Sequence, residues 1–180
     1  EKTKTFNRKY HHEYWFLWKE TALILNYSNN TWYTYTNMPF ASMLEVDQRT
    51  FGFTQEGTIK EVSRSYRNDD GEEISAYAAT GAMDFDRDWQ LKYSPVIFVA
   101  IKPENNARIT VTAESNRRSD YPDKVVAASF ASFTNVDFNH WSFLTNRKPQ
   151  VERLKLKVKK ATFYRLIFKS DSASATATVL

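Results

Sequence analysis

Residues 151–160 alternate apolar and charged side chains with a period of two, reading Val-Glu-Arg-Leu-Lys-Leu-Lys-Val-Lys-Lys. A β-strand buried on one face produces this pattern, because successive side chains point to opposite faces of a sheet. We expect the apolar residues of the strict repeat to point into a core: Leu154, Leu156 and Val158. We expect the cationic residues between them to face solvent: Arg153, Lys155, Lys157 and Lys159. The segment therefore predicts a sheet protein.

The composition of the 180-residue chain favours an all-β core. Aromatic residues make up 16% of it, with 5 Trp, 10 Tyr and 13 Phe, enough to fill a core and still leave rings for a contact surface. Cysteine is absent, which excludes disulfides and thiolate zinc sites and fits folding in a reducing cytoplasm. The 25 basic and 21 acidic residues nearly balance, so net charge alone predicts no nucleic-acid partner. No apolar run of about 18 residues and no leader pattern occurs, so no membrane span or signal peptide is predicted.

The first part of the chain contains short aromatic and aliphatic runs separated by turn-forming residues. The expected strands are residues 13–18, 21–27, 31–36, 41–46, 50–54 and 58–62. Such a meander is typical of β-propeller blades, each of which needs roughly 40–50 residues. This part therefore predicts one blade to one and a half blades.

A polar, glycine-containing segment, residues 67–73, indicates a domain boundary. We expect a blade-like β-meander over residues 1–68 and a second domain over residues 69–180. The strands expected in the second domain are residues 74–80, 96–101, 108–114, 127–133, a segment near 141–144, 150–158, 163–169 and 175–180. Their spacing predicts an antiparallel β-sandwich of jelly-roll-like type. The chain begins without Met and ends in a β-prone run, so we expect it to be part of a longer protein.

One acidic segment imitates the start of a calcium-binding loop. Asp84, Asp86 and Asp88 have the right spacing, but Trp89 stands at the position that requires glycine and Pro95 at the closing glutamate. A solvated loop explains these residues better than a metal site.

Catalytic and other metal patterns are also weak. His11 and His12 are adjacent, so on a strand they point to opposite faces, and His140 is distant in sequence. Glu72 and Glu73 lie in a predicted turn, where their side chains diverge, rather than forming a carboxylate pair for glycoside hydrolysis. The sequence predicts no catalytic residue, metal or cofactor, and a protein that is not an enzyme.

The cations of the alternating segment form a candidate interaction surface: Arg153, Lys155, Lys157, Lys159 and Lys160. The favoured interpretation is a solvated face whose charges prevent edge-to-edge pairing. A second is contact with an acidic neighbouring protein, and the least favoured is contact with the phosphates of DNA. Phosphate sites usually place aromatic rings beside the cations, and the nearest rings in sequence, Phe163 and Tyr164, lie beyond a turn.

Tryptophans form a candidate aromatic contact set: Trp15, Trp18, Trp32 and Trp141. Packing between sheets is the favoured interpretation, because Leu17 and Leu23 share the same strands. Aromatic rings on a sheet face also stack on sugar rings, so the alternative is a carbohydrate-binding module.

Two groups of residues resemble a known family. The first is Asn26-Tyr27, Thr31-Trp32-Tyr33, Phe51-Gly52, Glu56-Gly57-Thr58-Ile59, Asp70-Gly71 and Ile74. The second is Phe130, Phe133, Val136-Asp137-Phe138, Phe143, Arg147, Pro149 and the basic segment 153–160. Together they resemble the last propeller blade and the following β-sandwich of tail or neck structural proteins of tailed bacteriophages.

The resemblance implies a virion component that folds in the cytoplasm of the bacterial host. It implies several copies around the tail axis, in a homo-oligomeric ring that contacts other virion proteins through surfaces rather than a reacting centre. In the alternative interpretation, the sandwich binds glycans, for example during adsorption to the host surface. Neither interpretation involves a membrane or favours nucleic acid as a partner.

Overall fold

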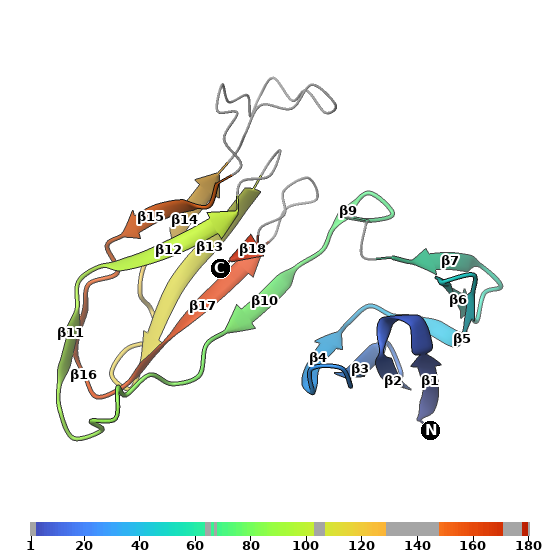
Figure 1. The fold of residues 1–180 in the computed structure, drawn as a ribbon, viewed down its shortest axis with the longest axis horizontal. Helices are drawn as coiled ribbons and strands as arrows, with labels where there is room; N and C mark the ends of the chain where they lie inside the picture. Colours follow the sequence, from blue (N-terminus) through green and yellow to red (C-terminus); the bar gives the residue numbers. More distant parts are fainter. Residues whose placement is uncertain are drawn as a thin grey trace. The chain divides into compact units, whose positions relative to one another are not determined.

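The computed structural model describes residues 3–63, 66, 68–102, 107–128, 148–170 and 178–179. The chain divides into two compact units, Glu1–Tyr66 and Arg67–Leu180, next to the polar segment expected as a boundary (Figure 1). Every strand pairing among the described residues is antiparallel, and these residues contain no α-helix. The predicted all-β fold is confirmed.

The first unit consists of two meandering sheets. The four-stranded sheet has the order β1 (Lys4–Arg8), β2 (Glu13–Trp18), β3 (Thr21–Asn26) and β4 (Thr31–Tyr35), with a short 3-10 turn over Lys9–His11. The three-stranded sheet has the order β5 (Phe40–Val46), β6 (Arg49–Thr54) and β7 (Ile59–Val62). All six expected strands are present, and β1 is an additional strand that the sequence did not predict.

The core of the first unit lies on one face of the four-stranded sheet. Its buried residues are Trp15, Leu17, Ala22 and Ile24. Met43 of β5 and Val62 of β7 pack against this cluster, so the second sheet covers this face. We call it the inner face of the four-stranded sheet.

The second unit is a β-sandwich with two smaller ribbons. One sheet has the order β10 (Ala76–Ala79), β17 (Tyr164–Ser170), β13 (Ala107–Ser115) and β14 (Lys124–Ala128). The other has the order β15 (Gln150–Leu154), β12 (Ile97–Lys102) and β18 (Thr178–Val179). The two-stranded ribbons are β8 (Asn68–Asp69) with β9 (Glu72–Glu73), and β11 (Lys92–Ser94) with β16 (Val158–Ala161).

The sandwich core contains residues from both sheets. Ile109, Val111 and Val126 come from the four-stranded sheet, and they cluster with Ile101 of β12 and Leu154 of β15. A second cluster continues the core under β16 and includes Leu156, Val158 and Tyr164. The predicted inward orientation of the three apolar residues of the alternating segment is therefore confirmed.

The prediction of one strand over residues 150–158 is wrong. β15 ends at Leu154 and β16 begins at Val158, in a different pairing, and between them Lys157 has a left-handed backbone with φ of 58°. The break lies opposite Pro95, which has no N–H to continue a ladder; the Lys157 N–H donates instead to the Pro95 carbonyl, at 3.2 Å. Buried and exposed residues therefore continue to alternate through the break, while the pairing partner changes from β12 to β11.

Other boundaries differ from the sequence predictions. The strand expected over 127–133 begins earlier, at Lys124. The strands β8, β9 and β11 were not predicted from the sequence. The segment near 141–144 lies outside the described residues, as does 175–180 apart from 178–179.

Candidate functional site: two exposed sheet surfaces

The outer face of the four-stranded sheet carries large apolar side chains. Alternation along β2, β3 and β4 places these residues there: Tyr14, Phe16, Trp18, Leu23, Leu25 and Trp32. We call this set the aromatic face. Trp18 is 53% exposed and Trp32 is 54% exposed. The sheet is therefore apolar on both sides, although the second sheet covers only the inner one.

The rings of the aromatic face contact each other. Phe16 and Trp32 stack with their centroids 6.1 Å apart and their planes at 26°. Tyr14 contacts Tyr27, which follows β3, at a centroid distance of 6.0 Å. The Lys19 ammonium lies 5.0 Å from the Trp18 ring centroid, a cation–π geometry. Together these contacts join the rings into a continuous surface that is largely uncharged.

The structure separates the predicted tryptophan contact set. Trp18 and Trp32 lie on the aromatic face, whereas Trp15 is fully buried on the inner face and belongs to the core. Trp141 lies outside the described residues. Because Trp15 and Trp18 are three positions apart on one strand, alternation alone places them on opposite faces.

A buried polar cluster lies beneath the inner face. The Glu13 carboxylate, fully buried, accepts hydrogen bonds from Arg8 Nη1 at 3.1 Å, Trp15 Nε1 at 2.9 Å and the Tyr33 hydroxyl at 2.5 Å. Arg8 Nε donates to Thr50 Oγ1 of the second sheet at 2.6 Å. This Glu13 cluster joins the two sheets of the unit, and it was not predicted from the sequence.

The second candidate surface contains the predicted cations. All five cations are exposed, and for Arg153, Lys155, Lys157 and Lys159 this agrees with the expected outward orientation, whereas the alternation did not predict it for Lys160. None of the five forms an ion pair with any described residue. Elsewhere, three exposed arginines each form an ion pair with a carboxylate: Arg49 with Glu61, Arg118 with Asp120 and Arg165 with Glu114.

Strand pairing brings aromatic rings to these cations from a distant part of the sequence. Tyr93 of β11 is the register partner of Lys159, whose ammonium lies 5.8 Å from the ring centroid. Phe98 of β12 is the register partner of Arg153. The side chains of Tyr93 and Phe98 are 62% and 69% exposed. Neither ring was predicted from the sequence, because strand-pairing partners that are distant in the chain leave no local signal.

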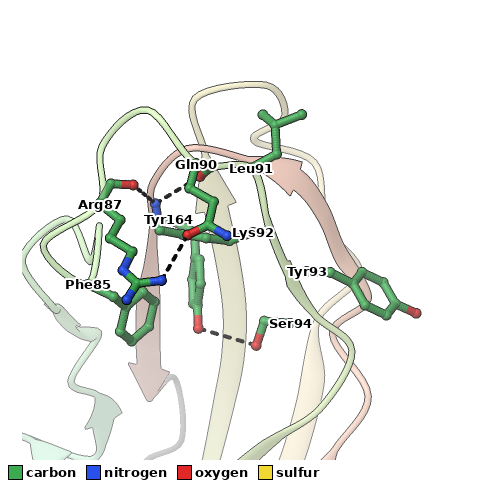
Figure 2. A pocket seen from close by; sticks show the side chains of 8 residues that line it. All are labelled: Phe85, Arg87, Gln90, Leu91, Lys92, Tyr93, Ser94 and Tyr164. Carbon is green, nitrogen blue, oxygen red and sulfur yellow. Dashed lines mark hydrogen bonds between the residues drawn. The ribbon is translucent and has the colours of Figure 1, made fainter.

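A pocket of about 530 Å³ lies beside β11 (Figure 2). Its lining residues are Phe85, Arg87, Gln90, Leu91, Lys92, Tyr93, Ser94 and Tyr164. The Lys92 ammonium donates to three backbone carbonyls, those of Arg87, Gln90 and Thr162. Its three donors are therefore used to hold the loop before β11 onto the sheet, and we assign Lys92 a structural role.

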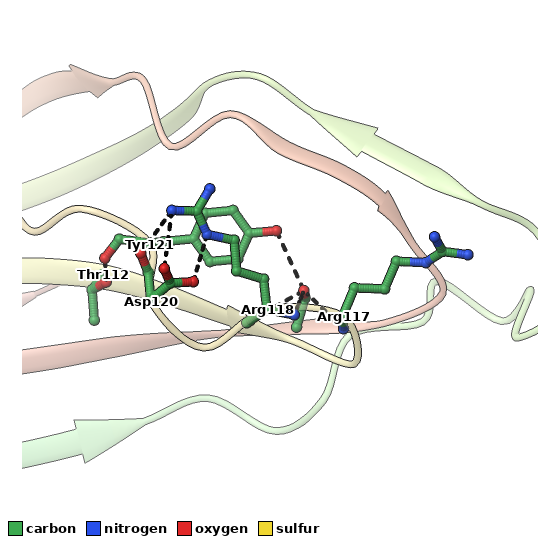
Figure 3. A network of polar contacts seen from close by, with 6 residues as sticks. Thr112, Arg117, Arg118, Asp120 and Tyr121 are labelled. Atoms are coloured by element: carbon green, nitrogen blue, oxygen red, sulfur yellow. Dashed lines mark hydrogen bonds and ion pairs between the residues drawn. The ribbon is translucent and has the colours of Figure 1, made fainter.

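A second polar network stabilises the connection between β13 and β14 (Figure 3). Arg118 Nε donates to Asp120 Oδ1 at 2.6 Å, and its guanidinium lies 5.1 Å from the Tyr121 ring centroid. The Thr112 hydroxyl donates to the Tyr121 carbonyl at 2.9 Å. The hydrogen bond from Arg118 lowers the pKa of Asp120 below its ordinary value. These contacts fix the turn that holds the Tyr121 ring in the core.

The remaining predicted candidates lie in turns and loops. The backbone N–H of Asp86 donates to Asp84 Oδ1 at 3.1 Å, which closes a local turn. His12 packs its ring against Tyr27, with centroids 5.5 Å apart, and His140 lies outside the described residues. Within the part of the chain that the structure describes, no group of three His, Cys, Asp or Glu side chains could hold a metal ion. The same residues include no helix long and apolar enough to cross a membrane.

Comparisons of the chain with protein-family models, with curated proteins and with solved structures found no significant match.

Proposed function

We propose that the protein is a non-enzymatic structural component of a tailed-bacteriophage virion, acting through contacts with copies of itself and with neighbouring virion proteins. The aromatic face is the observation that carries this proposal. Exposed apolar patches of this kind mark protein interaction surfaces. The proposed place of folding is the cytoplasm of the bacterial host, and the proposed final location is the virion.

The chemistry of the aromatic face suits subunit contact. A sheet that is apolar on both faces is typical of a layer enclosed between two others. The second sheet supplies one of these layers, and we propose that a neighbouring subunit supplies the other. Tryptophan and tyrosine are also the residues that most often dominate binding energy at the centre of an interface.

The proposal is tested by the oligomeric state of the chain, whose monomer mass is 21.1 kDa. Size-exclusion chromatography with light scattering is expected to find multimers, and electron microscopy to find rings. The double variant Trp18→Thr/Trp32→Thr should dissociate them, because it removes both exposed rings while keeping β-forming residues. The matched control is Trp89→Thr in the second unit, which removes an indole that is 78% exposed and should leave the multimers intact.

A monomer at every concentration, with no association with other virion components, would contradict the proposal. Dissociation by the Trp89 control to the same extent would show that the aromatic face is not the contact.

The stacked rings also favour a second candidate, a carbohydrate-binding surface. Trp32 lies on Phe16 as a flat platform, and such platforms stack against the faces of sugar rings. In this case glycans should quench tryptophan fluorescence and Trp32→Ala should abolish the effect. Trp141→Ala is also predicted to abolish the quenching by glycans. A glycan panel that causes no quenching removes this candidate.

A further inference from the structure

We propose that the second unit binds single-stranded nucleic acid on the surface formed by the exposed cations and their cross-strand aromatic partners. We call this surface the cation–aromatic ribbon: Tyr93, Phe98, Lys102, Arg153, Lys155, Lys157, Lys159 and Lys160. The ribbon shares no residue with the aromatic face, and this proposal does not depend on the proposed virion function.

The ribbon is built from two chain segments that run antiparallel. Residues 92–102 supply β11 and then β12. Residues 150–161 run in the opposite direction and supply β15, which pairs with β12, and then β16, which pairs with β11. The two pairings are separate, but the hydrogen bond from Lys157 to Pro95 connects them across the break. The Tyr93 and Phe98 rings, both exposed, therefore lie five residues apart along one two-stranded path.

The ribbon carries positive charge that forms no ion pair with any residue the structure describes. Lys102, like the five cations of segment 153–160, is exposed and forms no ion pair with any described residue. Glu152 is exposed, but it is the register partner of buried Val99 and shares its face of β15 with Leu154, so it lies on the opposite face of the strand from Arg153. A phosphate backbone would supply the missing negative charge and release its own counterions on binding.

A bulge in β16 increases the charge density at one end. Lys92 pairs with Ala161, and the next residue, Tyr93, pairs with Lys159. Lys160 is therefore the extra residue of the bulge, with φ of 52°. Lys159 and Lys160 are consequently both exposed, whereas a regular strand would have turned one of them inward. The bulge therefore places two adjacent ammonium groups on the surface next to Tyr93.

The exposed rings favour nucleic acid over an acidic protein. Proteins that bind single strands combine a cationic track with aromatic side chains on which bases stack. Tyr93 and Phe98 supply such rings beside Lys159 and Arg153. An acidic protein would need the cations but not the rings. The bases of a duplex are already stacked, so the ribbon should prefer single strands.

The test is fluorescence anisotropy of a labelled thymidine oligonucleotide of about 12 nucleotides, a length within the site sizes of single-strand binders. The native chain should bind it at low salt, and the affinity should fall as salt rises. Lys155→Gln/Lys159→Gln should weaken binding and reduce the slope of log affinity against log salt by about 1.4, or 0.7 for each lost phosphate contact. Tyr93→Thr/Phe98→Thr should weaken binding at least about tenfold with little change in the slope.

Two further variants act as controls. Lys4→Gln/Lys9→Gln removes the same net charge from exposed positions of the first unit and should leave both affinity and slope nearly unchanged. Tyr93→Phe/Phe98→Tyr keeps both rings and should bind like the native chain, which separates loss of stacking from loss of folding.

Absence of binding at low salt would overturn the proposal. So would native affinity in the Tyr93→Thr/Phe98→Thr variant, or equal weakening by the Lys4/Lys9 control. Binding to polyglutamate as tight as binding to the oligonucleotide would assign the ribbon to an acidic protein and would also overturn it.

Discussion

Replacing Glu13 by leucine should destabilise the first unit strongly. The Glu13 carboxylate is fully buried and pairs with Arg8, whose side chain is 4% exposed. The substitution leaves a buried guanidinium without its carboxylate, with Thr50 as its remaining acceptor in the cluster. It also removes the acceptor of the Trp15 N–H.

The size of the effect follows from these contacts. Removing one partner of a buried ion pair costs about 3–5 kcal/mol. Removing the acceptor of a buried N–H costs a further 1–3 kcal/mol or so. The total of roughly 4–8 kcal/mol is comparable with the whole stability of a marginal domain. In the double variant Arg8→Met/Glu13→Leu both charges are gone, so most of the ion-pair part of the loss should be recovered.

Amide hydrogen exchange of β2 and β3 is the suitable assay, because it reports opening of the first unit separately from the second. Single Arg8→Met and Glu13→Leu variants complete the double-mutant cycle. A loss below about 1 kcal/mol for Glu13→Leu would refute the reasoning, since that is the level of an exposed pair. A double variant that loses the sum of the single losses would refute the coupling between the two charges.

Three other predictions concern single positions. Gly52→Ala would place a Cβ 2.4 Å from Phe40 Cδ1, so urea unfolding should show a loss of about 1–3 kcal/mol. Leu156→Ala creates a cavity in the second unit and should lower the free energy of unfolding by about 2–5 kcal/mol in the same assay. By NMR, the pKa of Asp120 should be lower than that of an ordinary aspartate because of its hydrogen bond with Arg118, and Arg118→Gln should raise it. Because the folded pKa of Asp120 is lowered, the stability it contributes is present above the unfolded pKa and is lost as pH falls through the folded pKa.

Local patterns were sufficient for most strands of the first unit. Its β-hairpins join apolar runs through short polar turns, as in Asp47 and Gln48 between β5 and β6, where both residues have positive φ. Periodicity and turn residues are properties of neighbouring positions, so the sequence displays them directly. β1 was missed because its sequence, Lys-Thr-Phe-Asn-Arg, contains only one apolar residue and forms a strand through pairing with β2.

Long-range pairing explains what the sequence did not predict. Residues 150–158 have the periodicity of one strand, but they divide into β15 and β16 at a break that lies opposite Pro95, 62 positions before Lys157 in the chain. The Glu13 cluster likewise depends on Thr50, which lies 42 residues from Arg8. Burial and exposure could therefore be predicted from local alternation, whereas hydrogen-bond partners required the fold.

The same distinction changes the interpretation of the exposed cations. In sequence they have no neighbouring aromatic residue, which favours a solvated strand face over a phosphate site. In the structure Tyr93 and Phe98 meet them across two strands, although both rings are more than 50 positions away in the chain. The lack of aromatic neighbours in sequence is therefore no reason to exclude phosphate binding by these cations.

The two proposed surfaces differ in chemistry, so salt should affect them in opposite ways. Contact through the aromatic face is apolar and should persist at high ionic strength, or strengthen in salts such as sulfate that are excluded from protein surfaces. Binding at the cation–aromatic ribbon depends on phosphate charge and should be lost over the same range. A multimer that dissociates as salt rises would place the subunit contact among the ribbon cations instead of at Trp18 and Trp32. One salt series, with light scattering and anisotropy measured on the same samples, therefore tests which surface each partner uses.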